Sequence, residues 1–237
     1  MLSLSPDEDE RRHRKPVPPI GLADQTQDSI EVPRIVIDLS ISPPDYAFSR
    51  PKAPTMTLKV VMEHSRQDII TLYTENSPLD PRHCLTRSGA SILDLTTGQH
   101  AKTVNIRNVN RGPNPRRRVQ GCIEEAYFVT LQTGIPIEIP IYFGRPSRRP
   151  QPWSEIRRSV AVTGVDGLEP GHEYEVGFSE DDLRSIMWAP VHKQDILLEN
   201  SDHGLEDNLE SYPWIKDKPL DFVIHPANLK VLVEDAI

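Results

Sequence analysis

The sequence predicts an all-β protein, an antiparallel immunoglobulin-like β-sandwich with one short helix and a disordered N-terminal arm. Apolar and polar residues alternate in many short segments, which is the pattern of half-buried strands. Clusters of glycine, proline, asparagine and aspartate separate these segments and indicate turns. Only one segment has helical periodicity, and many short strands joined by turns are typical of a sandwich.

The chain is expected to form one domain. It has 237 residues, and all-β sandwiches commonly reach about 200–250 residues as a single unit. Residues 1–29 mix charges, proline and glutamine with almost no periodic apolar positions, which predicts a disordered arm. The sandwich should then occupy residues 30–237, with long loops at about 107–121, 144–157 and 200–219, the last of them acidic.

The first strands are expected in two strongly alternating segments, residues 33–41 and 55–63. Each places apolar residues on one face and polar residues on the other. These apolar residues are Ile35, Ile37, Leu39 and Ile41, and Met56, Leu58, Val60 and Met62. Residues 68–74 follow after a short polar link, so we expect them to form a hairpin with the second segment.

Further strands are expected in the middle of the chain. Residues 91–97 form a weaker strand that ends at a glycine, and residues 102–106 form another. Residues 126–131 and 135–143 form a pair joined by a short link that ends at Gly134.

The segment 135–143 is expected to lie at the edge of a sheet. Isoleucines at alternate positions predict one apolar face, and prolines interrupt the other face. A proline has no backbone N–H to donate to a ladder, so within sheets it is confined to edge strands. The residues between the isoleucines are Pro136, Glu138 and Pro140.

The last third of the chain combines strands with the single predicted helix. Residues 159–164 and 172–178 are expected to be strands next to Asp-Gly and Pro-Gly turns, and residues 219–225 form a closing strand. The helix should begin after Ser179 as its N-cap and end before Pro190. Its apolar face consists of Leu183, Ile186 and Met187.

The order of these segments resembles the propeptide domain of fungal deuterolysin-type metalloproteases. The resemblance rests on LKVVMEHSRQDIITLYTENSPLDPR (58–82), EEAYFVTLQTGIPIEIPI (124–141) and GVDGLEPGHEYEV (164–176), and it covers about residues 55–178. The same layout is similar to bacterial intracellular proteinase inhibitors, to other immunoglobulin-like sandwiches and to a group of uncharacterised fungal proteins. It implies the non-catalytic half of a protease precursor, with a folding-assistant or inhibitor role.

The sequence contains no recognised catalytic or metal-binding motif. A deuterolysin carries an H-E-x-x-H helix, whereas His172-Glu173 continues here without a second histidine and lies in a strand pattern. The eight histidines are scattered, and no P-loop, dinucleotide fingerprint or G-x-S-x-G motif occurs. We therefore expect no catalytic residue, no metal and no cofactor.

The two cysteines, Cys84 and Cys122, are too few for a disulfide framework. Small buried side chains are expected for both, with a cross-strand approach of the two or a nucleophilic Cys122 as alternatives. Trp153, Trp188 and Trp214 are expected in the core, with interface anchors as the alternative. No apolar run approaches the roughly 20 residues of a membrane span, and no signal-peptide pattern is found, so we expect a cytoplasmic or nuclear protein.

Charge is unevenly distributed along the chain, whose formal net charge is -8. Residues 101–158 carry eleven Lys/Arg against four Asp/Glu, and residues 159–237 carry five against seventeen. The three arginines at 116–118 lie beside prolines that prevent a regular helix or ladder, so their guanidinium groups are expected to project into solvent from a loop. The candidate partner-binding residues are Arg111, Arg116, Arg117, Arg118, Arg145, Arg148 and Arg149.

Three classes of function remain. The favoured one is a non-catalytic interaction module, inhibitor- or chaperone-like, that presents loops or an edge strand to a protein partner. If that partner is acidic, the arginine loop could bind it. The second is an enzyme whose pocket is built from loops without a motif. The third is a binder of anionic ligands or nucleic acid through residues 116–118, against which the overall acidity counts. The sequence gives neither the identity of the partner nor the oligomeric state.

Overall fold

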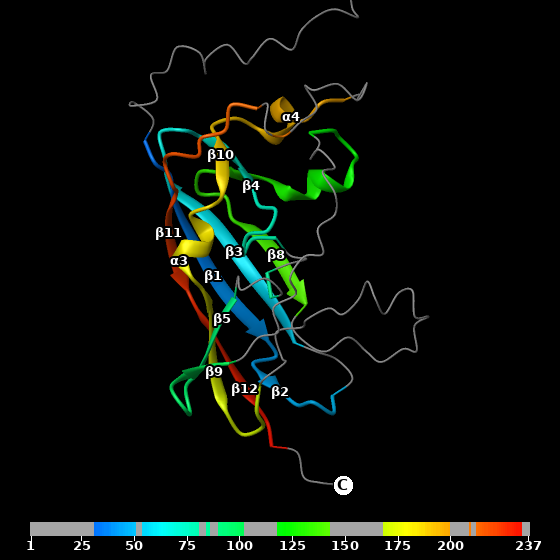
Figure 1. The fold of residues 1–237 in the computed structure, drawn as a ribbon, viewed down its shortest axis with the longest axis vertical. Coiled ribbons are helices and arrows are strands. Elements are labelled where there is room, and N and C mark those ends of the chain that lie inside the picture. The colour runs from blue at the N-terminus through cyan, green and yellow to red at the C-terminus, as the bar shows by residue number, and fades with distance from the viewer. Residues whose placement is uncertain are drawn as a thin grey trace, which may run out of the picture. The chain divides into compact units, whose positions relative to one another are not determined.

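The computed structural model describes residues 31–50, 54–80, 84–85, 90–101, 118–142, 168–199, 209 and 212–233. Contacts between residues divide the chain into two units, Met1–Glu31 and Val32–Ile237. Every helix and strand described below belongs to the second unit (Figure 1). The predicted arm, the predicted strands 102–106 and 159–164, and the predicted loop 144–157 lie outside the described residues.

Strands dominate the second unit. In chain order they are β1 (Arg34–Ser42), β2 (Asp45–Tyr46), β3 (Thr55–His64), β4 (Ile69–Tyr73), β5 (Ala90–Asp94), β6 (Gln99–His100), β7 (Phe128–Gln132), β8 (Ile137–Tyr142), β9 (Glu173–Phe178), β10 (Met187–Ala189), β11 (Asp221–His225) and β12 (Ala227–Val231). The described helices are short, and they are the 3₁₀ helix η3 (Ile123–Tyr127) and the α-helices α3 (Glu180–Leu183) and α4 (Lys193–Ile196). The part of the chain that the structure describes is therefore a β-rich fold, as predicted.

The first sheet has the strand order β11-β1-β3-β8, and β1 and β3 lie side by side through its middle (Figure 1). β3 pairs with both β1 and β8 in antiparallel register. β8 ends the sheet, so the predicted edge position of segment 135–143 is confirmed. The prediction of a purely antiparallel fold is wrong, because β11 runs parallel to β1, with Asp221 opposite Arg34. Alternation of apolar residues does not encode the direction of a partner strand, and mixed sheets are common.

A second sheet, β10-β4-β7, corrects two predicted hairpins. β4 follows β3 in the chain but pairs with β7 and β10, and β8 follows β7 but pairs with β3. The ladder between β3 and β8 thus continues into another sheet as the ladder between β4 and β7. At this corner Gly134, with φ of 73°, donates its N–H to the Met62 carbonyl at 2.8 Å. The segment that contains β3 and β4 therefore stays paired with the segment that contains β7 and β8 when both pass from one sheet into the other. Nearness in sequence does not predict this pairing.

The third sheet, β2-β12-β9-β5-β6, contains three strands that are not predicted from the sequence, β2, β6 and β12. The chain passes Pro226 after β11 and continues as β12, which is antiparallel to β9 and parallel to β2. β11 and β12 are consecutive strands of the chain, as are β1 and β2. β11 pairs with β1 in the first sheet and β12 pairs with β2 in the third, and both pairs are parallel. Pro226 interrupts an otherwise extended segment, since a proline cannot donate to the ladder.

The core is built from the alternating residues that the sequence predicts. The inward-facing residues of β1 and β3 are at most 8% exposed. They are Ile35, Ile37, Leu39 and Ile41, and Met56, Leu58, Val60 and Met62. Trp188 and Trp214 are 0% and 7% exposed, which confirms their predicted place in the core, whereas Trp153 lies outside the described residues.

The predicted helix after Ser179 is shorter than expected. Ser179 is the N-cap residue of α3, but its side chain makes no capping hydrogen bond, and the helix ends at Leu183. Met187 begins β10 instead of continuing the helix, and the next residue, Trp188, pairs with Leu72 of β4. A short helix gains little from its own hydrogen bonds, so burial of Trp188 in a sheet outweighs the helical pattern. The helices η3 and α4 are not predicted.

Candidate functional site

Of the seven predicted partner-binding arginines, the structure describes Arg118. The others, Arg111, Arg116, Arg117, Arg145, Arg148 and Arg149, lie outside the described residues. Arg118 is 7% exposed. The expectation that its guanidinium group projects into solvent is therefore wrong, and the reason is the packing of later parts of the chain around it.

Arg118 is held by a hydrogen bond and by an aromatic ring. Its Nη1 donates to the carbonyl oxygen of Ile196 at 2.7 Å, and its Cζ lies 5.2 Å from the centre of the Tyr212 ring. A cation over an aromatic face is stabilised most where water is excluded. The backbone is fixed as well, since the N–H of Leu198 donates to the Arg118 carbonyl at 2.7 Å. Arg118 thus fastens the described end of the arginine run to the end of α4.

Tyr212 belongs to an aromatic cluster drawn from distant parts of the chain. The ring centre of Trp214 lies 5.1 Å from that of Tyr212 and 6.0 Å from those of both Tyr73 and Phe128. Nε1 of Trp214 donates to the carbonyl of Leu209, which is 1% exposed, at 2.9 Å. The described part of the predicted acidic loop is therefore anchored to the core by large aromatic side chains. Trp214 is expected in the core from the sequence, whereas the burial of Tyr212 is not predicted.

Burial raises the pKa of Tyr212 to about 12, although the charge of Arg118 acts in the opposite direction. The phenol therefore stays neutral at ordinary pH. A neutral ring beside Arg118 offers the guanidinium group an aromatic face, which is consistent with a role in packing.

A second set of polar contacts holds the same segment to α4. Nζ of Lys193 lies 3.1 Å from Oε1 of Glu125, and Oε2 of Glu125 accepts the N–H of Gly121 at 2.7 Å. The hydrogen bonds from Gly121 and from Lys193 lower the pKa of Glu125. The N–H of Lys193 also donates to Oγ1 of Thr130 in β7 at 3.2 Å. These polar groups satisfy one another, so they act as structural ties.

The pair of Asp94 and His172 is the described arrangement that most resembles a general-base site. Nδ1 of His172 is hydrogen-bonded to Oδ2 of Asp94 at 2.8 Å, and its Nε2 lies 3.8 Å from Oε2 of Glu169. A carboxylate that orients a histidine can prepare it as a general base, but nucleophilic catalysis also needs a nucleophile beside the free nitrogen. Here Nε2 faces the carboxylate of Glu169 instead. The pair fastens the turn before β9 to the end of β5.

The acid dependence of stability should reveal this pair. Burial raises the pKa of Asp94, but hydrogen bonds from His172, Thr97 and Thr96 outweigh it and lower the pKa from the usual 3.8 to about 2. The ionised carboxylate therefore contributes its full share to the free energy of unfolding above the usual pKa of 3.8, and this share is lost as the pH falls through the lowered pKa of about 2. We expect Asp94→Asn to be less stable than the wild type at pH 7 in urea denaturation, with the gap narrowing as the pH falls to 2. A gap that does not change with pH would contradict this role.

The cysteines differ in their surroundings, and both are free thiols. Cys84 is fully buried, as predicted, whereas Cys122 is half-buried. Burial and the nearby Asp80 raise the pKa of Cys84, so its thiol stays protonated and is a poor nucleophile. In the part of the chain that the structure describes, no group of three or more His, Cys, Asp or Glu is placed to hold a metal ion.

β8 has an edge with an uneven hydrogen-bonding capacity. Pro136 just before the strand, and Glu138 and Pro140 within it, are exposed. Pro140 lies opposite Thr57 of β3. Because proline has no N–H to donate, we infer that Pro140 and Thr57 form a non-hydrogen-bonded pair, so the carbonyl of Pro140 points away from β3. Alternation directs the N–H and C=O of Glu138 outward as well. The stretch from Pro136 to Pro140 therefore offers several outward carbonyl groups but only one outward N–H, that of Glu138.

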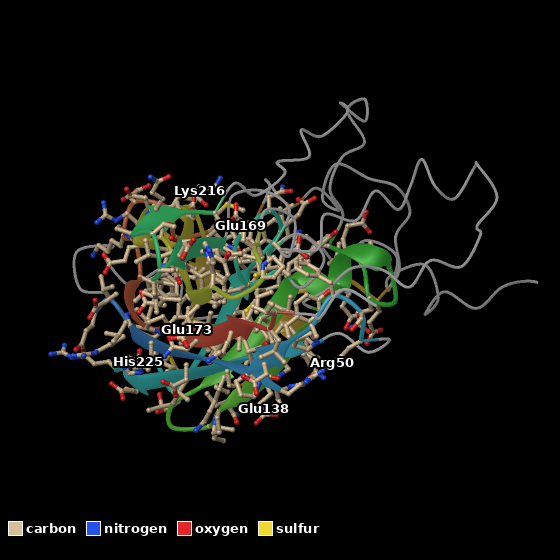
Figure 2. All side chains as sticks on the ribbon, turned by 90° about the horizontal axis from the view of Figure 1, so that it is seen from below. Arg50, Glu138, Glu169, Glu173, Lys216 and His225 are labelled. Carbon is tan, nitrogen blue, oxygen red and sulfur yellow. The ribbon has the colours of Figure 1, made fainter. Side chains whose placement is uncertain are left out.

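A row of charged residues crosses the first sheet and ends at this edge. His225 of β11 lies opposite Asp38 of β1, Asp38 opposite Lys59 of β3, and Lys59 opposite Glu138 of β8. Nδ1 of His225 lies 2.5 Å from Oδ1 of Asp38. Residues that are directly opposite share one face of a sheet, and Figure 2 shows His225 and Glu138 on the same side of the structure. Acids alternate with basic residues along the row, which leaves the acid Glu138 at its outer end.

This charge row is not predicted from the sequence. Glu138 is expected only as an outward position of an edge strand, and its relation to Lys59 depends on which strands pair and in which register. The opposite charges of the two residues in two predicted strands are the signal that could have indicated their pairing.

No family model, curated protein or solved structure matches the chain. Among the residues that the structure describes, no helix has both the length and the apolar character required to cross a membrane. The edge of β8 is the candidate site.

Proposed function

We propose that the chain is a non-catalytic protein-binding module that pairs an extended segment of its partner with the edge of β8. The observation that carries this proposal is that β8 ends its sheet and that, among the helices and strands that the structure describes, it packs extensively only against β3. Other strands at the ends of sheets have further neighbours: β11 contacts α3, β7 contacts α4, and Trp188 of β10 is bridged to Ile215. Unpaired backbone groups at a sheet edge bind extended peptides by adding a strand.

Three further features favour this function. The buried, alternating inner faces of the four- and five-stranded sheets favour an immunoglobulin-like β-sandwich, an architecture that carries its binding surfaces on loops and edges. The resemblance of residues 55–178 to protease propeptides and proteinase inhibitors favours a protein as the partner and an inhibitor- or chaperone-like role. The described polar clusters around Arg118 and His172 act as structural ties, which is consistent with a binding role.

Hydrogen exchange tests the proposed function. The partner is isolated from native cells with the full chain as bait and purified, and amide exchange of the chain is then compared with and without it. We expect slower exchange at the amide of Glu138, because this outward N–H gains an acceptor in the complex. Exchange in β5 and β6, which belong to another sheet, should stay unchanged. Protection confined to elements other than β8, or turnover of a substrate by the purified chain, would contradict the proposal.

A further inference from the structure

We propose that the edge of β8 selects an extended segment that places a lysine or an arginine directly opposite Glu138. This inference rests on the proposed function and specifies the partner's chemistry. Glu138 is the position between Pro136 and Pro140 at which a partner strand can both donate to β8 and accept from it. The partner residue aligned with Glu138 is therefore the best-fixed residue of the pairing.

The charge row determines which residue fits at this position. Along the row, His225, Asp38 and Lys59 precede Glu138, so that each acid has a basic residue beside it on the next strand. Opposite charges on directly opposed residues stabilise a strand pair, and like charges destabilise it. A basic residue on an added strand continues the alternation, whereas an acidic residue would stand opposite Glu138 and oppose binding.

The inner side of β8 provides a template for this recognition. β3 already presents Lys59 opposite Glu138 and Thr57 opposite Pro140 in antiparallel register. An added strand meets the same outward-facing side chains of β8 from the other side. A segment with the alternation of β3 should therefore fit the outer edge in the same register.

The same features disfavour a second copy of this chain as the occupant. Two antiparallel β8 edges that each use the N–H of Glu138 would place the two Glu138 carboxylates opposite one another. A register shifted by two residues would place Glu138 opposite a proline that cannot donate. The edge therefore opposes its own copy and admits a strand with a basic residue, which is how specificity against a competing partner is built.

Peptide binding to the full chain tests the inference. The probe is a terminally blocked, fluorescent peptide with the sequence of residues 55–63, TMTLKVVME, and a matched peptide carries glutamate in place of its lysine. We expect the lysine peptide to bind about three- to tenfold more tightly in fluorescence anisotropy at low salt, because the two peptides differ by one cross-strand charge pair. The preference should be lost with Glu138→Gln and reversed with Glu138→Lys.

Glu175→Lys is the matched control, since it changes an acid on β9 in a different sheet, and it should leave the preference intact. Equal affinities for the two peptides, absence of binding, or loss of the preference in the control variant would overturn the inference. These outcomes are separate from the proposed function. If the natural partner slows exchange at Glu138 while the peptides show no charge preference, the edge binds a partner but does not select a basic residue.

Discussion

Replacing Arg118 by alanine is expected to lower the free energy of unfolding by about 2–4 kcal/mol. The substitution removes the donor that reaches the Ile196 carbonyl at 2.7 Å and the cation that lies over the Tyr212 ring. It also removes the apolar stem of a side chain that is 7% exposed, and so leaves a cavity. Urea denaturation of the full chain, followed by circular dichroism, measures the loss. Arg118→Met should lose less, because it keeps the volume of the stem.

The control for Arg118 is Arg34→Ala. Nε of Arg34 lies 3.6 Å from Glu63, and the two side chains are 49% and 44% exposed. An exposed pair of this kind contributes about 0–1 kcal/mol. If Arg118→Ala costs no more than Arg34→Ala, the guanidinium group of Arg118 is a solvated surface charge. The stability difference between the two variants therefore decides between an anchor and the exposed loop that the sequence predicts.

Several strands could be predicted from the sequence because burial on one face leaves a local trace. Over most of their length β1 and β3 alternate between apolar and polar residues, and their inward-facing residues are the ones that the sequence assigns to the core. The edge position of β8 is also local information, since Pro140 excludes a central strand by its missing N–H alone. Each of these predictions depends on neighbouring residues within a single segment.

The pairing of the strands could not be predicted in the same way. Asp38 and His225 are 187 positions apart, yet they lie opposite one another because β11 runs parallel to β1. The corner at which β3 and β4 change sheets together with β8 and β7 depends on contacts between distant segments. Sequence proximity predicts hairpins at both places, and both predictions are wrong.

The candidate site fails to appear in the sequence for the same physical reason. Arg116, Arg117 and Arg118 are chemically identical, and Arg118 becomes an anchor only because Tyr212 and Ile196 pack around it. Glu138 stands out only once β3 and β8 are known to pair in the register that places Lys59 beside it. Residues whose role depends on tertiary contacts can therefore be identified only from the structure.

Replacing Trp214 by alanine is expected to cost about 3–5 kcal/mol, the range for a buried tryptophan. Trp214 is 7% exposed, contacts the rings of Tyr73 and Phe128, and donates from Nε1 to Leu209. Its loss leaves a cavity between strands that come from different parts of the chain. Circular dichroism in urea measures the effect without relying on tryptophan fluorescence.

Leu95→Ala is the control for Trp214, because Leu95 is an apolar residue that is 49% exposed, and its removal should cost less than about 0.5 kcal/mol. A cost for Trp214→Ala as small as that of Leu95→Ala would mean that this tryptophan makes no stabilising contact with β4 and β7. Arg118 would then lose its aromatic neighbourhood too, since Tyr212 lies 5.1 Å from Trp214, centre to centre. We expect instead that Trp214→Ala and Arg118→Ala each lower the free energy of unfolding strongly. The double variant should lose less than the sum of the two single losses, because residues that share the partner Tyr212 are energetically coupled.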